Sequence, residues 1–190
     1  MIIGDPARLA LESRITTAYS DPGLRALGMF VIHICGKRYG VHASDATMLA
    51  CSFNKVRERI AWRGRHTAPF VSEPDPGKIA DAYRHAIYAP GQETETFFGL
   101  KYAEFRSCIY QKQIAWAPDG DEAFDDGSFV LQLDKDDSVR LIGFKTNFEG
   151  YGHKVGTLSD LWIGADEFYR ILGEWSAAFE EEWRVAPKAR

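Results

Sequence analysis

Two short runs of alternating apolar residues, joined by a charged connection, constrain this chain more than any other feature. The apolar positions are Phe129, Leu131 and Leu133 in the first run and Val139 and Leu141 in the second, with Asp134, Lys135, Asp136 and Asp137 between them. Alternation with a period of two on both sides of a short polar connection is typical of a β-hairpin. The sequence therefore predicts a rigid hairpin near the middle of the chain.

An acidic segment leads into this hairpin. It holds five carboxylates within eight residues: Asp119, Asp121, Glu122, Asp125 and Asp126. Such a segment can be a solvated turn, since Asp125-Asp126-Gly127 is typical turn chemistry, or an acidic surface that faces a partner. A calcium loop of the EF-hand type is excluded because its third acidic position, counted from Asp119, is Ala123. A two-metal site normally takes carboxylates from ordered strands together with a His or Lys from elsewhere.

Strand patterns surround the hairpin on both sides. Residues 7–18 alternate as a half-buried strand, and residues 27–35 are apolar on both faces, which is typical of a central strand. Short strands are expected at residues 39–42 and, at a sheet edge, at residues 160–163. With the helices below, these patterns predict a single α+β domain over residues 1–190, with a mainly antiparallel sheet and about four α-helices.

Four segments have helical spacing. The first begins at a Ser44–Asp45 cap and ends at Gly64, the second begins at Asp75-Pro76, and a shorter third follows a loop at residues 90–101. The exposed face of the first helix is predicted to be basic, through Lys55, Arg57, Arg59, Arg63 and Arg65. The long C-terminal helix has one wide apolar stripe, formed by Phe168, Ile171, Leu172, Trp175, Phe179 and Trp183.

Composition limits the function classes. The 190 residues are 45% hydrophobic with a formal net charge of -4, which supports a real core and argues against wholesale binding of nucleic acid or membrane. Three widely spaced cysteines, without a CxxC pair, are typical of a reduced intracellular protein with buried thiols. Asp5 interrupts the apolar run that a signal peptide needs, and no stretch is long enough to span a membrane. We expect a cytoplasmic protein.

Signatures of catalysis are missing from the sequence. It has no P-loop, no G-x-G-x-x-G and no G-x-S-x-G. His33 and Cys35 could begin a zinc site, but packing in the core is the better interpretation. The loop Tyr151–Lys154 and the basic helix face could bind a substrate or a phosphate backbone, although an ordinary surface explains both. The pattern favours a binding protein without a cofactor over an enzyme.

Several longer segments carry a family resemblance. The opening MIIGDPARLALES, the segments LGMFVIHICGKRYG and DATMLACSF, the central WAPDGDEAFDDGSFVLQLD and VRLIGF, and the closing DLWIGADEFYRILGEW and FEEEW occur in order along nearly the whole chain. Together they resemble the immunity protein 42 family of bacterial polymorphic-toxin systems. The resemblance implies a protein made beside a toxin gene. Such a protein binds the toxin's C-terminal domain and blocks it by occlusion, without catalytic residues, in contact-dependent inhibition or type VI secretion.

The resemblance gives the acidic segment a role. Many cytoplasmic toxins are nucleases with basic clefts, and a rigid acidic loop would complement such a cleft in a one-to-one complex. The expected contact set is therefore Asp119, Asp121, Glu122, Asp125 and Asp126. If the toxin is acidic at its contact surface, the face carrying Arg57, Arg59 and Arg63 becomes the candidate. Two alternatives stay open: a small metal-dependent hydrolase that uses the 119–126 loop, and a nucleic-acid-binding regulator that uses the basic helix.

Overall fold

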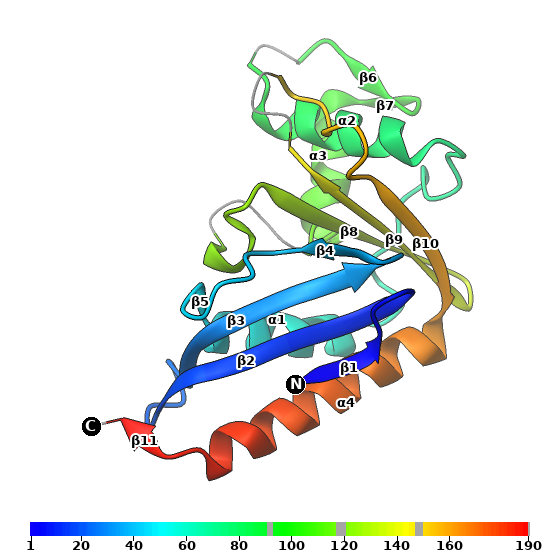
Figure 1. Cartoon of the computed structure of the whole chain (residues 1–190). Helices are drawn as coiled ribbons and strands as arrows, with labels where there is room; N and C mark the ends of the chain where they lie inside the picture. Colours follow the sequence, from blue (N-terminus) through cyan, green and yellow to red (C-terminus); the bar gives the residue numbers. More distant parts are fainter. Residues whose placement is uncertain (91–92, 117–120, 147–149, 190) are drawn as a thin grey trace.

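The structure is a computed structural model that describes residues 1–90, 93–116, 121–146 and 150–189. Its strands are β1 (Ile2–Asp5), β2 (Leu9–Tyr19), β3 (Ala26–Ile34), β4 (Lys37–Tyr39), β5 (Thr47–Met48), β6 (Thr96–Phe97), β7 (Leu100–Lys101), β8 (Ser128–Lys135), β9 (Ser138–Lys145), β10 (Ser159–Gly164) and β11 (Lys188–Ala189). Its helices are α1 (Leu49–Ala61), α2 (Pro76–Tyr88), α3 (Tyr102–Gln111), α4 (Ala165–Val185) and the short 3-10 helix η1 (Glu122–Phe124). The predicted α+β fold with a long C-terminal helix is confirmed (Figure 1).

The first sheet is built by the N-terminal strands. Its order is β1-β2-β3-β4, while β5 pairs with β3 and β11 pairs with β2. Only the β11–β2 pair is parallel among these strands. β3 has strand neighbours on both sides and is buried along most of its length. The central strand that the apolar run at residues 27–35 predicted is therefore confirmed.

The predicted hairpin forms a second sheet of its own. β8 and β9 pair antiparallel from Ser128–Lys145 to Lys135–Ser138, and β10 pairs with the free side of β9. β10 is the expected edge strand. Nearly every residue of β8 and β9 is buried, so the hairpin is covered on both faces. This sheet is consequently an inner layer of the molecule.

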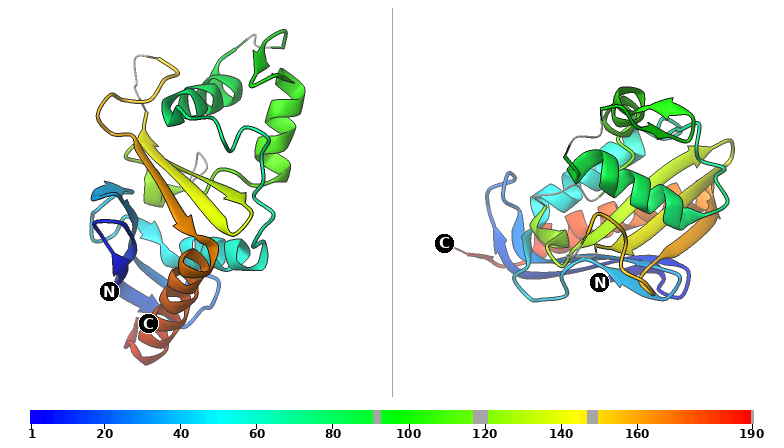
Figure 2. Two further views of the ribbon diagram at one scale, coloured as in Figure 1. Left: turned by 90° about the vertical axis from the view of Figure 1, so that its right-hand side faces the viewer. Right: turned by 90° about the horizontal axis from the view of Figure 1, so that it is seen from above.

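Two hydrophobic cores lie on opposite faces of the second sheet. Val130 and Leu141 face a core that includes the first sheet, α1 and α4. Leu131 and Phe144, on the other face, pack with α2 and α3. Figures 1 and 2 show this order: α2 and α3 lie on one side of the β8–β10 sheet, and the first sheet with α1 and α4 lies on the other. Successive residues of the hairpin therefore pack alternately into the two cores.

Two helices match their sequence patterns closely. The Asp75 carboxylate accepts hydrogen bonds from the backbone N–H groups of Gly77 at 2.9 Å and Lys78 at 3.4 Å, and Pro76 occupies the first turn of α2. This is the cap and first-turn chemistry that the sequence predicted. In α4 the predicted stripe lies inward, with Phe168, Ile171, Leu172, Trp175 and Phe179 buried and Trp183 half-buried.

The start of α1 differs from the prediction. The helix begins at Leu49 with Met48 at the cap position, so the cap expected at Ser44–Asp45 is wrong. Thr47 and Met48 instead pair with Gly28 and Leu27 of β3 as the short strand β5. Because pairing with β3 holds Thr47 and Met48 in an extended conformation, the helix begins only after Met48.

Three smaller expectations are also wrong. The strand predicted at residues 39–42 is β4, which ends at Tyr39 because its ladder with β3 closes there. The loop predicted at residues 90–101 contains the short β6–β7 pair. The cysteines, expected to be buried, are exposed at Cys35 and Cys51 and half-buried at Cys108. Cys35 lies in the turn after β3 with a φ of 52°, and Cys51 lies on the outer face of α1.

Candidate partner-binding surface

The described part of the acidic loop is an ordered turn around η1. The Asp121 carboxylate accepts a hydrogen bond from the N–H of Ala123 at 3.0 Å and caps η1. Asp126 accepts from the N–H of Ser128 at 3.1 Å and forms an ion pair with Lys145 of β9. Both side chains thereby fix the backbone that carries them, as Asp residues commonly do in turns.

The other two described carboxylates face solvent. Glu122 and Asp125 are exposed, whereas Asp121 and Asp126 are half-buried. Burial raises the pKa of Asp121, an effect that the hydrogen bond from Ala123 opposes and that the charges of Asp125 and Glu122 reinforce. Of the five residues predicted from the sequence, the structure therefore places two in structural roles and two at the surface. Asp119 lies outside the described residues.

The loop is attached to the first sheet by backbone contacts. The N–H of Val41 donates to the Ala123 carbonyl at 2.7 Å, and the N–H of Gly40 donates to the Ser128 hydroxyl at 3.0 Å. Gly40 has a φ of 120°, and a Cβ there would lie 3.0 Å from the Ala123 oxygen. Phe124 anchors the loop in the core, with its ring 6.3 Å from that of Phe30 in an edge-on arrangement. The exposed carboxylates are therefore held on a fixed backbone.

Arg59 supports the segment that leads into the loop. The sequence placed Arg59 on an exposed basic face, but its side chain is fully buried. Its guanidinium donates to the carbonyl oxygens of Gln113 at 3.0 Å and Ala115 at 2.6 Å, and it lies 5.3 Å from the centre of the Trp116 ring. The prediction failed because Arg59 follows Val56 by three residues and so shares the inner face of α1.

A buried polar network continues from Arg59. Its Nη1 donates to the Gln132 side chain at 3.1 Å, and Gln132 donates in turn to Asp134 at 2.9 Å. Asp134 also accepts from the Tyr169 hydroxyl at 3.1 Å. Burial lowers the pKa of Arg59 to about 9, although the charges of Tyr169 and Asp134 oppose the shift. Arg59 therefore stays charged at neutral pH, with its two Nη atoms bound to Gln132 of β8 and to the carbonyls of Gln113 and Ala115, while its Nε has no partner among the described residues.

The remaining basic residues of α1 and of the turn that follows it are partly paired with acidic side chains. Arg63 pairs with Asp166 and lies 5.1 Å from the centre of the Tyr169 ring, and Lys55 pairs with Glu58 at 3.1 Å. Arg57 and Arg65 are exposed. With Arg59 buried, this face offers fewer cations to a phosphate backbone than the sequence indicated.

His33, Cys35 and His153 each contact a different partner. His33 contacts Glu12 at 2.8 Å, while the Cys35 thiol points to the carbonyl of Asp160 at 3.8 Å, so the two do not converge. Neither lies in a core, which corrects the expectation from their spacing. His153, in the Tyr151–Lys154 loop, pairs with Asp81 of α2 at 2.7 Å. Across the described residues, no three His, Cys, Asp or Glu side chains are placed to hold a metal ion.

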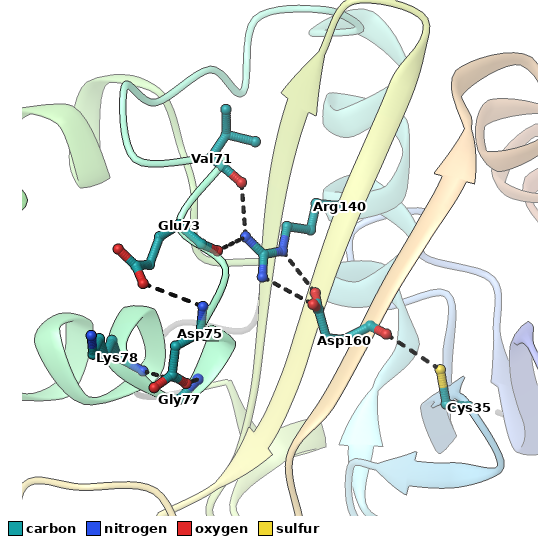
Figure 3. Close-up of polar contacts among 8 residues, drawn as sticks. All are labelled: Cys35, Val71, Glu73, Asp75, Gly77, Lys78, Arg140 and Asp160. Carbon is teal, nitrogen blue, oxygen red and sulfur yellow. Dashed lines mark hydrogen bonds and ion pairs between the residues drawn. The ribbon is translucent and has the colours of Figure 1, made fainter.

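A second charged group lies on the far end of the second sheet. Arg140 of β9 donates to both carboxylate oxygens of Asp160 on β10 and to the carbonyl oxygens of Val71 and Glu73 (Figure 3). Its side chain is 2% exposed and lies against Trp162, which is itself exposed. The sequence did not identify Arg140 or Trp162 as candidate contact residues. The signal was present, because Asp160 and Trp162 are the outward positions of an alternating edge strand.

Comparison with protein families decides the relationship of this chain to known proteins. The model of the family Imm42, described as immunity protein 42, matches residues 1–178. The chain belongs to the immunity protein 42 family. The resemblance seen in the sequence is therefore confirmed. Among solved structures, this immunity protein is similar to CdiI from Burkholderia dolosa AUO158, with a TM-score of 0.57 and 15% identity over 94% of this chain and 99% of that one. At this identity the likeness shows a shared fold.

No curated protein matches the sequence. None of the helices in the described residues is long and apolar enough to cross a membrane.

Proposed function

We propose that this immunity protein binds the C-terminal domain of a cognate toxin and neutralises it by covering its active site. The complex would protect the producing cell from contact-dependent or type VI-delivered inhibition. It would form one-to-one in the cytoplasm, without catalysis or a cofactor. Membership of the immunity protein 42 family supports the toxin-binding role.

The acidic loop is the proposed contact surface because its carboxylates have two different roles. Asp121 and Asp126 fix the turn, and Glu122 and Asp125 project from it into solvent. A partner that meets these two carboxylates does not have to order the backbone that carries them, so less conformational entropy is lost on binding. Exposed charges of one sign also raise the association rate with a partner of opposite charge. A basic nuclease is the toxin class that fits this surface.

A metal-dependent hydrolase receives no support from the described residues. Its candidate carboxylates in the 119–126 loop include two, Asp121 and Asp126, that are already engaged by backbone N–H groups and Lys145. A hydrolase would gain thermal stability from magnesium, manganese or calcium, because a ligand that binds the native state stabilises it. We expect no such gain.

The proposal is tested by capture of the partner. The tagged protein is used for a pull-down from its own cells, the bound proteins are identified by mass spectrometry, and the products of adjacent genes are checked first. We expect the C-terminal fragment of a large secreted protein. Recovery of no such fragment, together with a rise in melting temperature on addition of a divalent metal, would reject the proposal in favour of the hydrolase.

A further inference from the structure

Trp162 is a large apolar side chain that the fold leaves at the surface. β10 alternates strictly, with Leu161 and Ile163 turned into the core and Trp162 turned outward. The indole remains 42% exposed, whereas Trp116 and Trp175 are fully buried. Because burying a side chain of this size is favourable, and tryptophan is enriched among the residues that dominate binding energy, Trp162 is a candidate contact residue.

A buried arginine lies beside this ring, directly opposite Trp162 on the neighbouring strand β9. The Cζ atom of Arg140 lies 5.4 Å from the centre of the Trp162 ring. The guanidinium is itself held in place by hydrogen bonds (Figure 3). It donates to Asp160 through Nε at 2.7 Å and Nη2 at 2.9 Å, and to the carbonyls of Val71 and Glu73 through Nη1. Trp162 is therefore a preorganised aromatic surface, which is the character of side chains that dominate binding energy at interfaces.

The neighbouring surface is acidic. The register of β9 and β10 pairs Ser138 with Gly164, so the β8–β9 turn lies at the same end of the sheet as the end of β10. Asp136 and Asp137 are exposed on this turn, and the Asp166 side chain is 95% exposed at the start of α4. Nearby cations are already engaged: Lys135 donates to the Ser72 hydroxyl at 2.8 Å, and Arg63 pairs with Asp166.

We propose that Trp162 is the aromatic anchor of a contact with the toxin domain, and that it enters an apolar pocket bordered by basic side chains. Charge complementarity to Asp136 and Asp137 indicates the basic border, and the indole held beside Arg140 indicates the apolar pocket. This inference rests on the proposed function. It adds a surface at the opposite end of the second sheet from the acidic loop, since Ser128 begins β8 and pairs with Lys145 at the far end.

The test compares Trp162→Ala with the wild-type protein for affinity to the captured toxin domain, by calorimetry. We expect the dissociation constant to rise about 30-fold, the size typical of an aromatic anchor, and Trp162→Phe to retain most of the affinity. Tyr110→Ala is the matched control, because Tyr110 is also an exposed aromatic residue, 57% exposed, beside an arginine. Its affinity should equal that of the wild type. Melting temperatures of all variants establish that they are folded.

Each result decides the inference. If Trp162→Ala binds the toxin as tightly as the wild type, the anchor is rejected while the proposed function stands. If the wild-type protein itself fails to bind the toxin, both fail. Gel filtration distinguishes a second copy of this chain as the occupant. If the wild-type protein is a dimer that Trp162→Ala dissociates, and the affinity for the toxin is unchanged, then Trp162 forms a contact between two copies of this chain and the toxin anchor is rejected.

Discussion

Arg140 and Asp160 form a two-point ion pair between adjacent strands, with Nε 2.7 Å from Oδ1 and Nη2 2.9 Å from Oδ2. Arg140 is almost completely buried, and Nη1 of the same guanidinium donates to the carbonyl oxygens of Val71 and Glu73 before α2. One side chain thus connects β9, β10 and the segment that enters the helical layer. It also supports the ring of Trp162.

Replacing this arginine should destabilise the fold strongly. Arg140→Leu leaves the solvent-accessible Asp160 carboxylate and two carbonyl groups without their donor, and each buried acceptor left unsatisfied costs about 1–3 kcal/mol. Urea denaturation should show a loss of this size in the free energy of unfolding. Arg170→Leu breaks an exposed pair with Glu174 on α4 and should cost less than about 1 kcal/mol. Equal losses in the two variants would contradict the role assigned to Arg140.

Arg59 and Arg57 offer a second matched comparison within one helix. Arg59→Met removes a fully buried cation and leaves the carbonyls of Gln113 and Ala115 without its hydrogen bonds. We expect the free energy of unfolding to fall by about 1–3 kcal/mol, the cost of leaving a buried acceptor unsatisfied. Arg57→Met, on the exposed face, should change it by at most about 0.5 kcal/mol. If Arg57→Met were the more harmful change, the predicted basic face would have to be reconsidered.

His66 predicts a dependence of stability on pH. Burial, and then the charge of Arg59, hold the pKa of His66 below its ordinary value of 6.5. Its Nδ1 is 2.9 Å from the carbonyl of Lys112, and its Nε2 has no hydrogen-bond partner among the described residues. Because the folded pKa is the lower one, the unfolded chain takes up a proton first as the pH falls below 6.5. Stability is therefore complete above 6.5 and declines as the pH falls toward the folded pKa.

Melting temperatures from pH 8 to pH 5 measure this effect. The wild-type protein should lose more stability over this range than His66→Gln, which cannot take up the proton. Parallel curves for the two proteins would show that His66 does not contribute.

A side chain added at position 143 should disturb the packing of the core. A Cβ at this position would lie 2.5 Å from the Tyr39 ring, whose hydroxyl is held in place between the Thr157 carbonyl and the Ser159 hydroxyl, both 2.7 Å away. Gly143→Ala should therefore destabilise by about 1–3 kcal/mol, since an added methyl group in a packed core forces a displacement. Gly173→Ala, where a Cβ meets nothing within 4 Å, is the control. A more stable Gly143→Ala protein would disprove the close contact.

The sequence predicted the elements that depend on local patterns. The hairpin, the capped start of α2 at Asp75 and the stripe of α4 follow from periodicity and capping, which are properties of neighbouring residues. The separate second sheet did not follow, because which strands pair is decided by contacts between distant segments. The same limit explains Arg59, whose partners Gln113, Ala115 and Gln132 come from residues 54 to 73 positions away.

The candidate site was predicted in composition more than in geometry. Composition identified the acidic loop, but it could not separate Asp121 and Asp126, which fix the backbone, from Glu122 and Asp125, which face solvent. That division depends on the N–H groups of η1 and on Lys145 of β9. Trp162 was missed because the exposure of one aromatic residue is decided by the layers packed around it.

Affinity for the captured toxin domain tests most directly whether Glu122 and Asp125 contact the toxin. Glu122→Lys with Asp125→Lys reverses both exposed charges, and Glu174→Lys with Glu181→Lys makes the same change in net charge on the exposed face of α4. We predict that the first pair weakens binding at least about tenfold, mainly through a slower association rate that depends on salt, while the second pair has little effect. Equal affinities for the two double variants would contradict the account.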